Sequence, residues 1–357
     1  PFDDFLDFWK LRASWTIAKK DLGVYEINSV YNVSTDVWNG FSTALYPTTL
    51  RDPKVKPETE RSYEFGTDFR FLGNRLGFDF TYFNRLRYDR LISAPVSVAS
   101  GFNNMITNTQ EELLQKGIEI TLSGKPIKNL NFEWESSLNG GFWHWYYHKL
   151  DPIYSSKDPR LGKGERYDKF FIIDWERDPN GNIVHQAGLP VKNKFWSVMG
   201  YSDPKFIWGF TNRFKYKDFE VNFSFDGRIG GLMYSWTEQA LWHAGTHPES
   251  DNQWRYDEVV NGKHNYVGRG VKITDGVLKT DAYGNVIEDT RKFALNDVPV
   301  SYQNYTTIYN ENPWDHQAPH NIKDATFLNT VPSDDVSVKS VFKSVFVNVI
   351  TVKISVE

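Results

Sequence analysis

Apolar and polar residues alternate along several segments of this chain, and that pattern predicts β-strands. In residues 61–72 the aromatic side chains fall on one face and the charged side chains fall on the other. A short Gly73-Asn74 turn follows, and the same alternation resumes over residues 75–84. Two alternating runs joined by so short a turn predict a β-hairpin.

The period of two recurs through the rest of the chain. Further strands are predicted at residues 116–125, 131–140, 206–216, 220–228 and 351–356, with a shorter one at 11–15. Aromatic residues stand near the strand ends, at Tyr63, Tyr82, Trp134, Trp208 and Tyr216. Such residues are typical of the two interfaces of a membrane-spanning strand. The polar residues of the opposite face are Glu64, Asp68, Arg70, Asp79, Glu119, Glu133, Glu135 and Asp226, and they suit a wet lumen.

The connections between the predicted strands alternate between very short and very long. The short ones lie near residues 73–74, 127–129 and 217–218, and the long ones cover roughly 93–114, 143–205 and 231–325. Compact soluble domains rarely contain unstructured loops longer than about 15 residues. Outer-membrane barrels combine short periplasmic turns with long extracellular loops. We therefore predict an all-β fold, a transmembrane antiparallel β-barrel, in which the strands that begin at Arg61, Lys116 and Phe206 run towards the periplasm.

The composition agrees with that fold and excludes other classes. Phe, Tyr and Trp make up 16% of the residues, yet the mean hydropathy is -0.54, because lipid-facing and lumen-facing residues of a barrel cancel in an average. No apolar run reaches about 18 residues, so no transmembrane helix is predicted. A net charge of -4 offers no basic surface for nucleic acid. Cysteine is absent, which excludes disulfides and thiol nucleophiles, and no catalytic motif is present, so no enzyme is expected.

Three segments carry motifs that resemble the SusC/RagA-like TonB-dependent outer-membrane transporters. Residues 55–84 combine a Lys-Pro-Glu start, an alternating strand, a short turn and a Phe-Asn exit. Residues 113–139 contain a Lys-Gly-Ile-Glu strand followed by a proline-bearing turn. Residues 200–231 begin with Gly-x-x-x-Pro-x-Phe and end with Asp-Gly-Arg-x-Gly-Gly. The sequence after Asn329 departs from the family pattern.

The resemblance implies a barrel of about 22 strands in the full protein, of which residues 1–357 would supply roughly the last eight to ten. The plug domain and the TonB box of the family are expected outside this chain. The implied function is TonB-dependent import of an oligosaccharide or oligopeptide through the outer membrane of a Bacteroidota-like Gram-negative bacterium. The implied partners are the TonB complex, a SusD/RagB-like surface lipoprotein that forms a lid, the glycan or peptide substrate, and outer-membrane lipid.

The aromatic run at residues 142–148 is the candidate substrate-binding segment. It follows a predicted strand on the extracellular side, where Trp143, Trp145, Tyr146 and Tyr147 could stack on sugar rings or peptide side chains. The alternative is that Phe142 and Trp143 belong to the outer aromatic girdle and that the other rings pack within the loop.

Neither a cofactor nor a resident metal is expected. The spacing of Asp178, Asn180 and Asn182 resembles the opening of a calcium loop, but a hairpin turn explains it as well. The Gly284-Asn285 pair is interpreted in the same way. The four-residue spacings His144/His148 and His243/His247 would suit metal ligands only on a helix.

Two other functions remain open on these patterns. A soluble β-rich glycan-binding protein or glycoside hydrolase would have to bury its apolar strand faces between two sheets, whereas a barrel exposes them as a continuous band about 25 Å tall. A passive porin would need neither a plug nor a lid.

Overall fold

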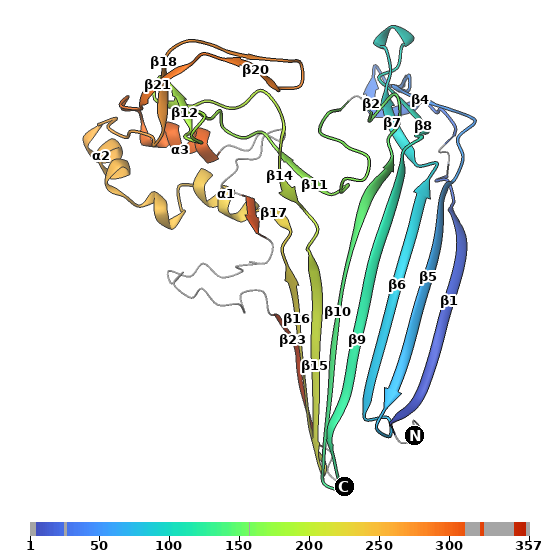
Figure 1. The fold of residues 1–357 in the computed structure, drawn as a ribbon. Helices are drawn as coiled ribbons and strands as arrows, with labels where there is room; N and C mark the ends of the chain where they lie inside the picture. Colours follow the sequence, from blue (N-terminus) through green and yellow to red (C-terminus); the bar gives the residue numbers. More distant parts are fainter. Residues whose placement is uncertain (1–4, 25–26, 157, 311–321, 325–345, 355–357) are drawn as a thin grey trace. The chain divides into compact units, whose positions relative to one another are not determined.

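The structure, a computed structural model, describes residues 5–24, 27–156 and 158–310 together with two strands at 322–324 and 346–354 (Figure 1). The chain divides into two compact units. One comprises Pro1–Tyr167, Lys205–Gly227 and Val345–Glu357, and we call it the barrel-sheet unit. The other comprises Asp168–Pro204 and Arg228–Ser344, and we call it the loop unit.

Eight strands of the described chain form one sheet in the order β1-β5-β6-β9-β10-β15-β16-β23. Their bounds are β1 Leu6–Lys20, β5 Glu58–Phe71, β6 Leu76–Tyr88, β9 Glu112–Lys128, β10 Phe132–Lys149, β15 Phe206–Tyr216, β16 Phe219–Ile229 and β23 Phe346–Ile354. The pairings recorded within this sheet are antiparallel. Each strand predicted from the alternation is present, and the predicted all-β fold is confirmed. Of the predicted last strand, Val356 lies outside the described residues.

Short turns join alternate pairs of these strands at one end of the sheet, the lower end in Figure 1. The turn between β5 and β6 contains Gly73 at φ +67° and Asn74 at φ +60°, a left-handed conformation that glycine and asparagine adopt most readily. In the turn between β9 and β10, the side chain of Asn129 accepts hydrogen bonds from the backbone N–H groups of Asn131 and Phe132 at 3.0 and 2.8 Å. These residue choices explain why connections on this side stay short.

The register of the sheet separates an apolar face from a polar face. One cross-strand row consists of Trp9, Phe69, Phe78, Leu122, Leu138 and Phe210. The adjacent row consists of Lys10, Asp68, Asp79, Thr121, Asn139 and Gly209. Because neighbouring rows point to opposite sides of a sheet, the alternation seen in each strand adds up to two chemically distinct faces.

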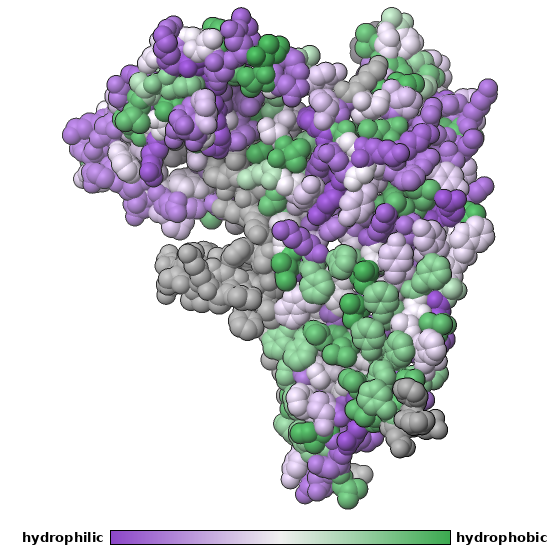
Figure 2. All heavy atoms as spheres, viewed as in Figure 1, coloured by the Kyte–Doolittle hydropathy of each residue, from purple (hydrophilic) through white to green (hydrophobic). Residues whose placement is uncertain are grey.

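The apolar face is exposed. The exposed fractions of Phe65, Ile120, Leu122 and Leu138 are 54%, 42%, 44% and 46%. Figure 2 shows apolar side chains gathered along the middle of these strands, with polar side chains towards their ends. A soluble sandwich would bury these side chains against a second sheet. An uncovered apolar face is what a lipid-facing barrel wall requires.

Smaller elements of the barrel-sheet unit lie in its long connections. They are β2 Asn32–Trp38, β3 Phe41–Leu45, β4 Thr49–Arg51, β7 Leu91–Pro95, η1 Val98–Ser100 and β8 Asn104–Asn108. Strands β2 and β3 form a hairpin around Asn39-Gly40, where both residues have positive φ. Strand β8 pairs with β4 in parallel and with β7 in antiparallel orientation.

The loop unit contains secondary structure that the alternation did not predict. Its strands are β11 Lys169–Ile172, β12 Val184–Gln186, β13 Leu189–Pro190, β14 Ser197–Tyr201, β17 Leu232–Tyr234, β18 Val271–Asp275, β19 Leu278–Thr280, β20 Val286–Asp289, β21 Lys292–Leu295 and β22 Ile322–Asp324. Its helices are α1 Trp236–His243, η2 Pro248–Ser250, α2 Gln253–Asn261 and α3 Tyr302–Asn310. In the part of the chain that the structure describes, no helix has the length and apolar character needed to cross a membrane.

The core of the loop unit is aromatic. Strands β13, β12, β18 and β21 form a four-stranded sheet. The ring of Trp175 stacks on Tyr309 with centroids 5.5 Å apart, and the ring of His185, a residue of β12, stacks on Tyr305 at 5.9 Å. Val184 has an exposed fraction of 0%. The described residues 168–204 and 231–310, which were predicted to lie in long loops, therefore fold into a packed unit of their own.

Candidate functional site

The aromatic run at 142–148 lies inside β10, which differs from its predicted position at the start of a loop. Strand β9 pairs with β10 as far as Lys149. On the other edge, the N–H of Tyr147 donates to the carbonyl of Glu165 at 2.9 Å, and the N–H of Tyr167 donates to the carbonyl of Trp145 at 2.8 Å. Because both edges are hydrogen-bonded, the strand continues beyond the point where its alternation becomes wholly aromatic.

The alternation within β10 divides the four candidate residues between the two faces. Trp143, Trp145 and Tyr147 follow Asn139 in steps of two and share the polar face, whereas Tyr146 belongs to the opposite face. Phe142 continues the apolar face and is 43% exposed, as the girdle interpretation expects. The structure therefore brings three of the four candidates together and separates the fourth.

Three cross-strand rows surround these three residues on the polar face. The rows are Glu64–Phe83–Gly117–Trp143, Ser62–Arg85–Gln115–Trp145 and Glu60–Arg87–Leu113–Tyr147. We call the surface formed by Glu60, Glu64, Phe83, Arg85, Arg87, Gln115, Trp143, Trp145 and Tyr147 the arginine–aromatic wall. It lies towards the end of the sheet that carries the long connections (Figure 1).

Each arginine of the wall is held by a ring and by a carboxylate. The guanidinium carbon of Arg85 lies 4.6 Å from the ring centroid of Phe83, and that of Arg87 lies 4.3 Å from the ring centroid of Trp145. Arg85 Nη2 donates to Glu64 Oε1 at 3.0 Å. Arg87 Nε donates to Glu60 Oε2 at 2.7 Å. The stacked ring fixes the plane of a guanidinium, and the carboxylate fixes its rotation in that plane.

Gly117 allows the rings to lie close to the sheet. A Cβ atom at this position would come within 2.4 Å of Phe83 Cζ and 2.6 Å of Trp143 Cβ. The side chain of the next residue in the wall, Gln115, is 7% exposed, and its Oε1 has no hydrogen-bond partner within the described chain. A buried acceptor without a donor costs about 1–3 kcal/mol. The wall therefore contains an acceptor that the described residues leave unsatisfied.

A third arginine repeats the arrangement just beyond the sheet. Arg90 Nη1 lies 2.8 Å from Glu111 Oε1, and its guanidinium carbon lies 5.4 Å from the ring centroid of Tyr167. The ring of Tyr167 is in turn 5.4 Å from that of Tyr147, which is 6% exposed. The pattern of arginine, carboxylate and ring thus extends from β6 into the first residues of the following connection.

Asp151 fixes the connection that follows β10. Its carboxylate accepts from Thr109 Oγ1 at 2.8 Å and from the backbone N–H groups of Gln110, Ile153 and Tyr154 at 2.7, 2.8 and 3.0 Å. Burial opposes ionisation of this side chain, but the hydrogen bonds from Ile153 and Gln110 outweigh burial and keep the pKa of Asp151 below its usual value. Two long connections are therefore held together next to the wall.

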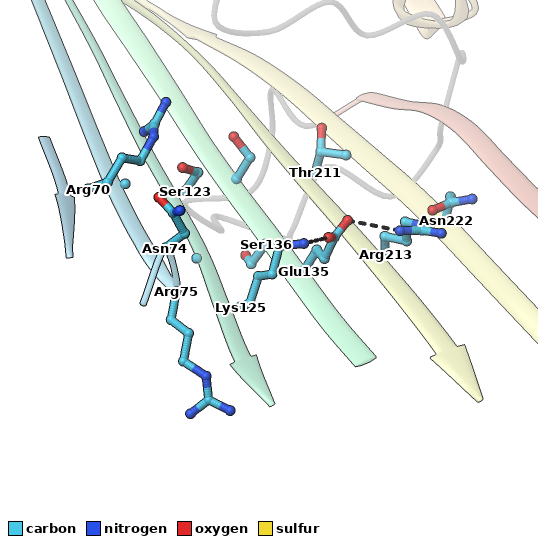
Figure 3. A pocket seen from close by; sticks show the side chains of 13 residues that line it. Arg70, Asn74, Arg75, Ser123, Lys125, Glu135, Ser136, Thr211, Arg213 and Asn222 are labelled. Carbon is cyan, nitrogen blue, oxygen red and sulfur yellow. Dashed lines mark hydrogen bonds and ion pairs between the residues drawn. The ribbon is translucent and has the colours of Figure 1, made fainter. Parts of the chain in front are cut away.

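A hollow of about 560 Å³, lined largely by polar residues, lies near the short turns of the same sheet (Figure 3). Arg213 bridges two carboxylates there, with Nη1 3.1 Å from Glu135 Oε2 and Nη2 2.9 Å from Glu220 Oε2. Lys125 pairs with the same Glu135 and with Glu133. In this hollow the cations of Lys125 and Arg213 are therefore both paired with carboxylates of the polar face.

The remaining candidates have structural roles. Asp178 Oδ1 accepts from the backbone N–H groups of Asn180 and Asn182 at 2.9 and 2.7 Å, in a turn closed by the bridge between Arg177 and Ile183. This is the predicted hairpin turn. His144 and His148 both lie in strand β10, so the helical spacing that would make them joint metal ligands does not apply.

The same bonding pattern recurs at Asp281. Its Oδ1 accepts from the backbone N–H groups of Tyr283 and Asn285 at 2.8 and 2.9 Å. The predicted turn at Gly284-Asn285 is thereby confirmed.

Comparison with known proteins agrees with this architecture. Residues 3–169 match the family model described as TonB dependent receptor-like, beta-barrel. The first half of the barrel sheet therefore matches the β-barrel of TonB-dependent receptors. The predicted resemblance to the SusC/RagA-like transporters is confirmed by the relatives and the solved structures that follow.

Two curated relatives are named as TonB-dependent receptors. The chain is 25% identical over 286 residues to TonB-dependent receptor P3 of Formosa agariphila, which covers 69% of this chain and 28% of that protein. It is 23% identical over 265 residues to TonB-dependent receptor SusC of Bacteroides thetaiotaomicron, which covers 63% of this chain and 25% of that protein. The chain therefore spans little more than a quarter of the length of these relatives.

Solved structures share the fold at low identity. The RagAB peptide importer in its open-open state matches with a TM-score of 0.56 and 15% identity, covering 90% of this chain and 32% of that chain. A second RagAB peptide transporter structure matches with a TM-score of 0.52 and 18% identity, covering 67% of this chain and 28% of that chain. At these identities the match establishes the fold of the receptor and nothing about its ligand.

Sequence reasoning missed the two arginines of the wall. The predicted strand ended at residue 84, whereas β6 continues to Tyr88. A signal was present, because Arg85 and Arg87 continue the period of two beyond Phe83 on the same face. It was overlooked because Asn84 interrupts the apolar face of the strand before Leu86 and Tyr88 resume it.

Proposed function

We propose that the complete protein imports an oligomeric nutrient, an oligosaccharide or an oligopeptide, through the outer membrane of a Bacteroidota-like bacterium. The observation that carries the proposal is the barrel sheet, with its exposed apolar face and its polar opposite face, in a chain whose relatives are TonB-dependent receptors. In this proposal residues 1–357 are the C-terminal part of the barrel, and the plug domain and TonB box belong to the rest of the protein.

The partners follow from the same reasoning. Energy would come from the TonB complex, and a SusD/RagB-like lipoprotein would cover the extracellular mouth. Support comes from a relative named SusC and from structural neighbours described as RagAB peptide importers. The long connections lie at one end of the barrel sheet, which we assign to the extracellular side, as barrels of this kind have it.

The substrate-contacting residues would be Trp143 and Trp145, on the face that we assign to the lumen, and the buried Tyr147 would support them from within the strand. Tyr146, which belongs to the opposite face, would contribute to the outer surface of the barrel wall instead. The arginines beside these rings add hydrogen-bond donors to a stacking surface, which is a combination that suits polar oligomers.

The experiment that tests this function uses the complete protein in its native membrane. Outer membranes are solubilised in mild detergent, the tagged protein is purified, and co-purifying proteins are identified. We expect detergent dependence and a lipoprotein in similar abundance. Uptake is then compared in cells with and without a functional TonB complex, and it should be lost without one.

Other outcomes would replace the proposal. A protein that stays soluble without detergent would favour the soluble glycan-binding or glycoside hydrolase alternative, against which the exposed apolar face argues. Uptake that persists without TonB and without a lipoprotein would indicate a passive porin.

A further inference from the structure

The arginine–aromatic wall has open donors that its own carboxylates do not use. Arg87 donates to Glu60 through Nε, so its two Nη groups have no hydrogen-bond partner in the described part of the chain. Arg85 donates to Glu64 through Nη2 and keeps Nε and Nη1 free of partners among the described residues. The two side chains are 42% and 37% exposed, so the described residues leave them open.

An arginine in this state is prepared to bind a carboxylate. Its plane is fixed by the ring beneath it, and its open N–H groups point in a defined direction, which lowers the entropy lost when two parallel hydrogen bonds form. Charge-assisted pairs of this kind are stronger than neutral hydrogen bonds. We propose, building on the import function proposed above, that the wall binds extended acidic peptides, with the carboxylates of alternate residues on Arg85 and Arg87.

The spacing of the two arginines favours a peptide. They are two residues apart on β6, which separates their backbone positions by about 6.6–6.8 Å. An extended peptide that lies along the strand has the same repeat, so its residues i and i+2 present side chains at that distance on one side. Two acidic residues separated by one other residue therefore match Arg85 and Arg87 in register.

The acceptors of the wall favour a peptide as well. Glu64 binds Arg85 through Oε1 only, and Glu60 binds Arg87 through Oε2 only, so each leaves an oxygen for a donor. Gln115 lies between Arg85 and Trp145 in register and holds an unsatisfied buried Oε1. A peptide backbone supplies N–H donors beside its acidic side chains, whereas the wall offers acceptors and donors in alternation. The wall is therefore complementary to a peptide, which carries N–H donors and carboxylate acceptors along one chain.

The test is a binding measurement on the complete protein in mild detergent. The probes are an octapeptide with aspartate at alternate positions in a threonine background, its isomer with the aspartates in one block, its asparagine analogue, and an acidic oligosaccharide of similar length. We expect the alternating peptide to bind about tenfold more tightly than the asparagine analogue, and more tightly than the block isomer.

Substitutions locate the site. Arg85→Gln with Arg87→Gln should weaken the alternating peptide by about tenfold or more. Arg12→Gln is the matched control, because Arg12 also belongs to the polar face and pairs with Asp79 at 2.9 Å, but lies outside the wall. It should leave the affinity unchanged. Folding of each variant is checked by heat-modifiable electrophoretic mobility, and Arg→Lys at both positions, which keeps the charge but loses the fork, should restore only part of the affinity.

Equal binding of the alternating peptide and its asparagine analogue, or binding of the acidic oligosaccharide alone, would overturn the inference. So would a double variant that folds and binds as the wild type does. If these failures occur in a protein that still co-purifies with a lipoprotein and takes up its nutrient with TonB, only the peptide inference is wrong. If lipoprotein and TonB dependence are also missing, the import function fails.

Discussion

Arg87 lies over the indole ring of Trp145, with its guanidinium carbon 4.3 Å from the ring centroid. The two residues come from strands β6 and β10, which are separated in the sheet by β9. Their contact therefore crosses a whole strand, and it brings together parts of the sequence that are far apart to form the arginine–aromatic wall.

The neighbouring residues Trp145 and Tyr146 give the first prediction. Trp145→Ala should reduce substrate affinity by about tenfold, because it removes the ring and releases Arg87. Tyr146→Ala, on the other face of the same strand, should change the affinity by less than about twofold. Direct binding assays on the complete protein measure both. Equal losses in the two variants would contradict the assignment of faces.

Gly117 gives a prediction about stability. Gly117→Ala should lower the free energy of unfolding by about 1–3 kcal/mol, because its Cβ would collide with Phe83 and Trp143. Gly124→Ala is the control on the same strand, since its nearest neighbour, the carbonyl oxygen of Arg75, would be 3.6 Å away. Urea unfolding in lipid vesicles, followed by tryptophan fluorescence, compares them. A Gly124→Ala variant as unstable as Gly117→Ala would show that crowding is not the cause.

The two faces of β9 predict opposite responses to a charge. Ile120→Arg should impair membrane insertion at a cost of about 2–4 kcal/mol, because Ile120 belongs to the exposed apolar face. Thr121→Arg places the same side chain on the polar face and should insert normally. Folding yield into vesicles, scored by heat-modifiable mobility, distinguishes the two. Normal insertion of Ile120→Arg would mean that this face does not contact lipid.

Asp151 predicts a local effect on the connections beside the wall. Asp151→Ala leaves the donors of Thr109, Gln110 and Ile153 without their acceptor, which costs about 1–3 kcal/mol of local stability. Hydrogen exchange around residues 109–111 and 151–156 should rise. Asp36→Ala, an exposed carboxylate, serves as the control and should leave those amides unaffected.

His185 makes the loop unit sensitive to acid. Burial keeps the pKa of His185 below its usual value of 6.5, so the unfolded unit binds a proton at a higher pH than the folded unit does. Stability is therefore full above about pH 6.5 and falls as the pH drops towards the folded pKa. Hydrogen exchange in residues 168–204 should accelerate between about pH 7 and about pH 5, after correction for intrinsic rates.

Two variants test that assignment. In His185→Phe this acid sensitivity should disappear, because no titrating group remains at the buried position. His243→Gln, an exposed histidine in the same unit, should keep it. Acid sensitivity that survives His185→Phe would assign the effect to another group.

The strands were predictable because one face of each has to be apolar along its length. That constraint weakens where a strand leaves the apolar band, as at Arg85 and Arg87 in β6, and there the predicted ends were too short. The same weakening placed Trp145 and Tyr147 in a loop. The direction of the strands across the membrane stays a prediction. After Asn329 the structure describes only strand β23.

The loop unit was not predictable from local patterns. Its core depends on contacts between distant residues, such as Trp175 with Tyr309 and His185 with Tyr305, and no short window of sequence contains both partners. The hydrogen bond between His185 and Tyr305 closes a separation of 120 residues. Helices of eight or nine residues with mixed polarity give little periodic signal of their own.

The loop unit is built from two segments that are separated in the chain by Lys205–Gly227, and this separation limits when the unit can fold. Strand β12 pairs with β18 across the hairpin of β15 and β16 that separates them in the chain. During synthesis the first half, Asp168–Pro204, emerges without the second half that completes its core. It has to remain soluble until Arg228 and the residues after it arrive. Assembly is therefore expected to be slow, because Trp175 and Val184 lack the packing partners of the folded unit until the second half has been made.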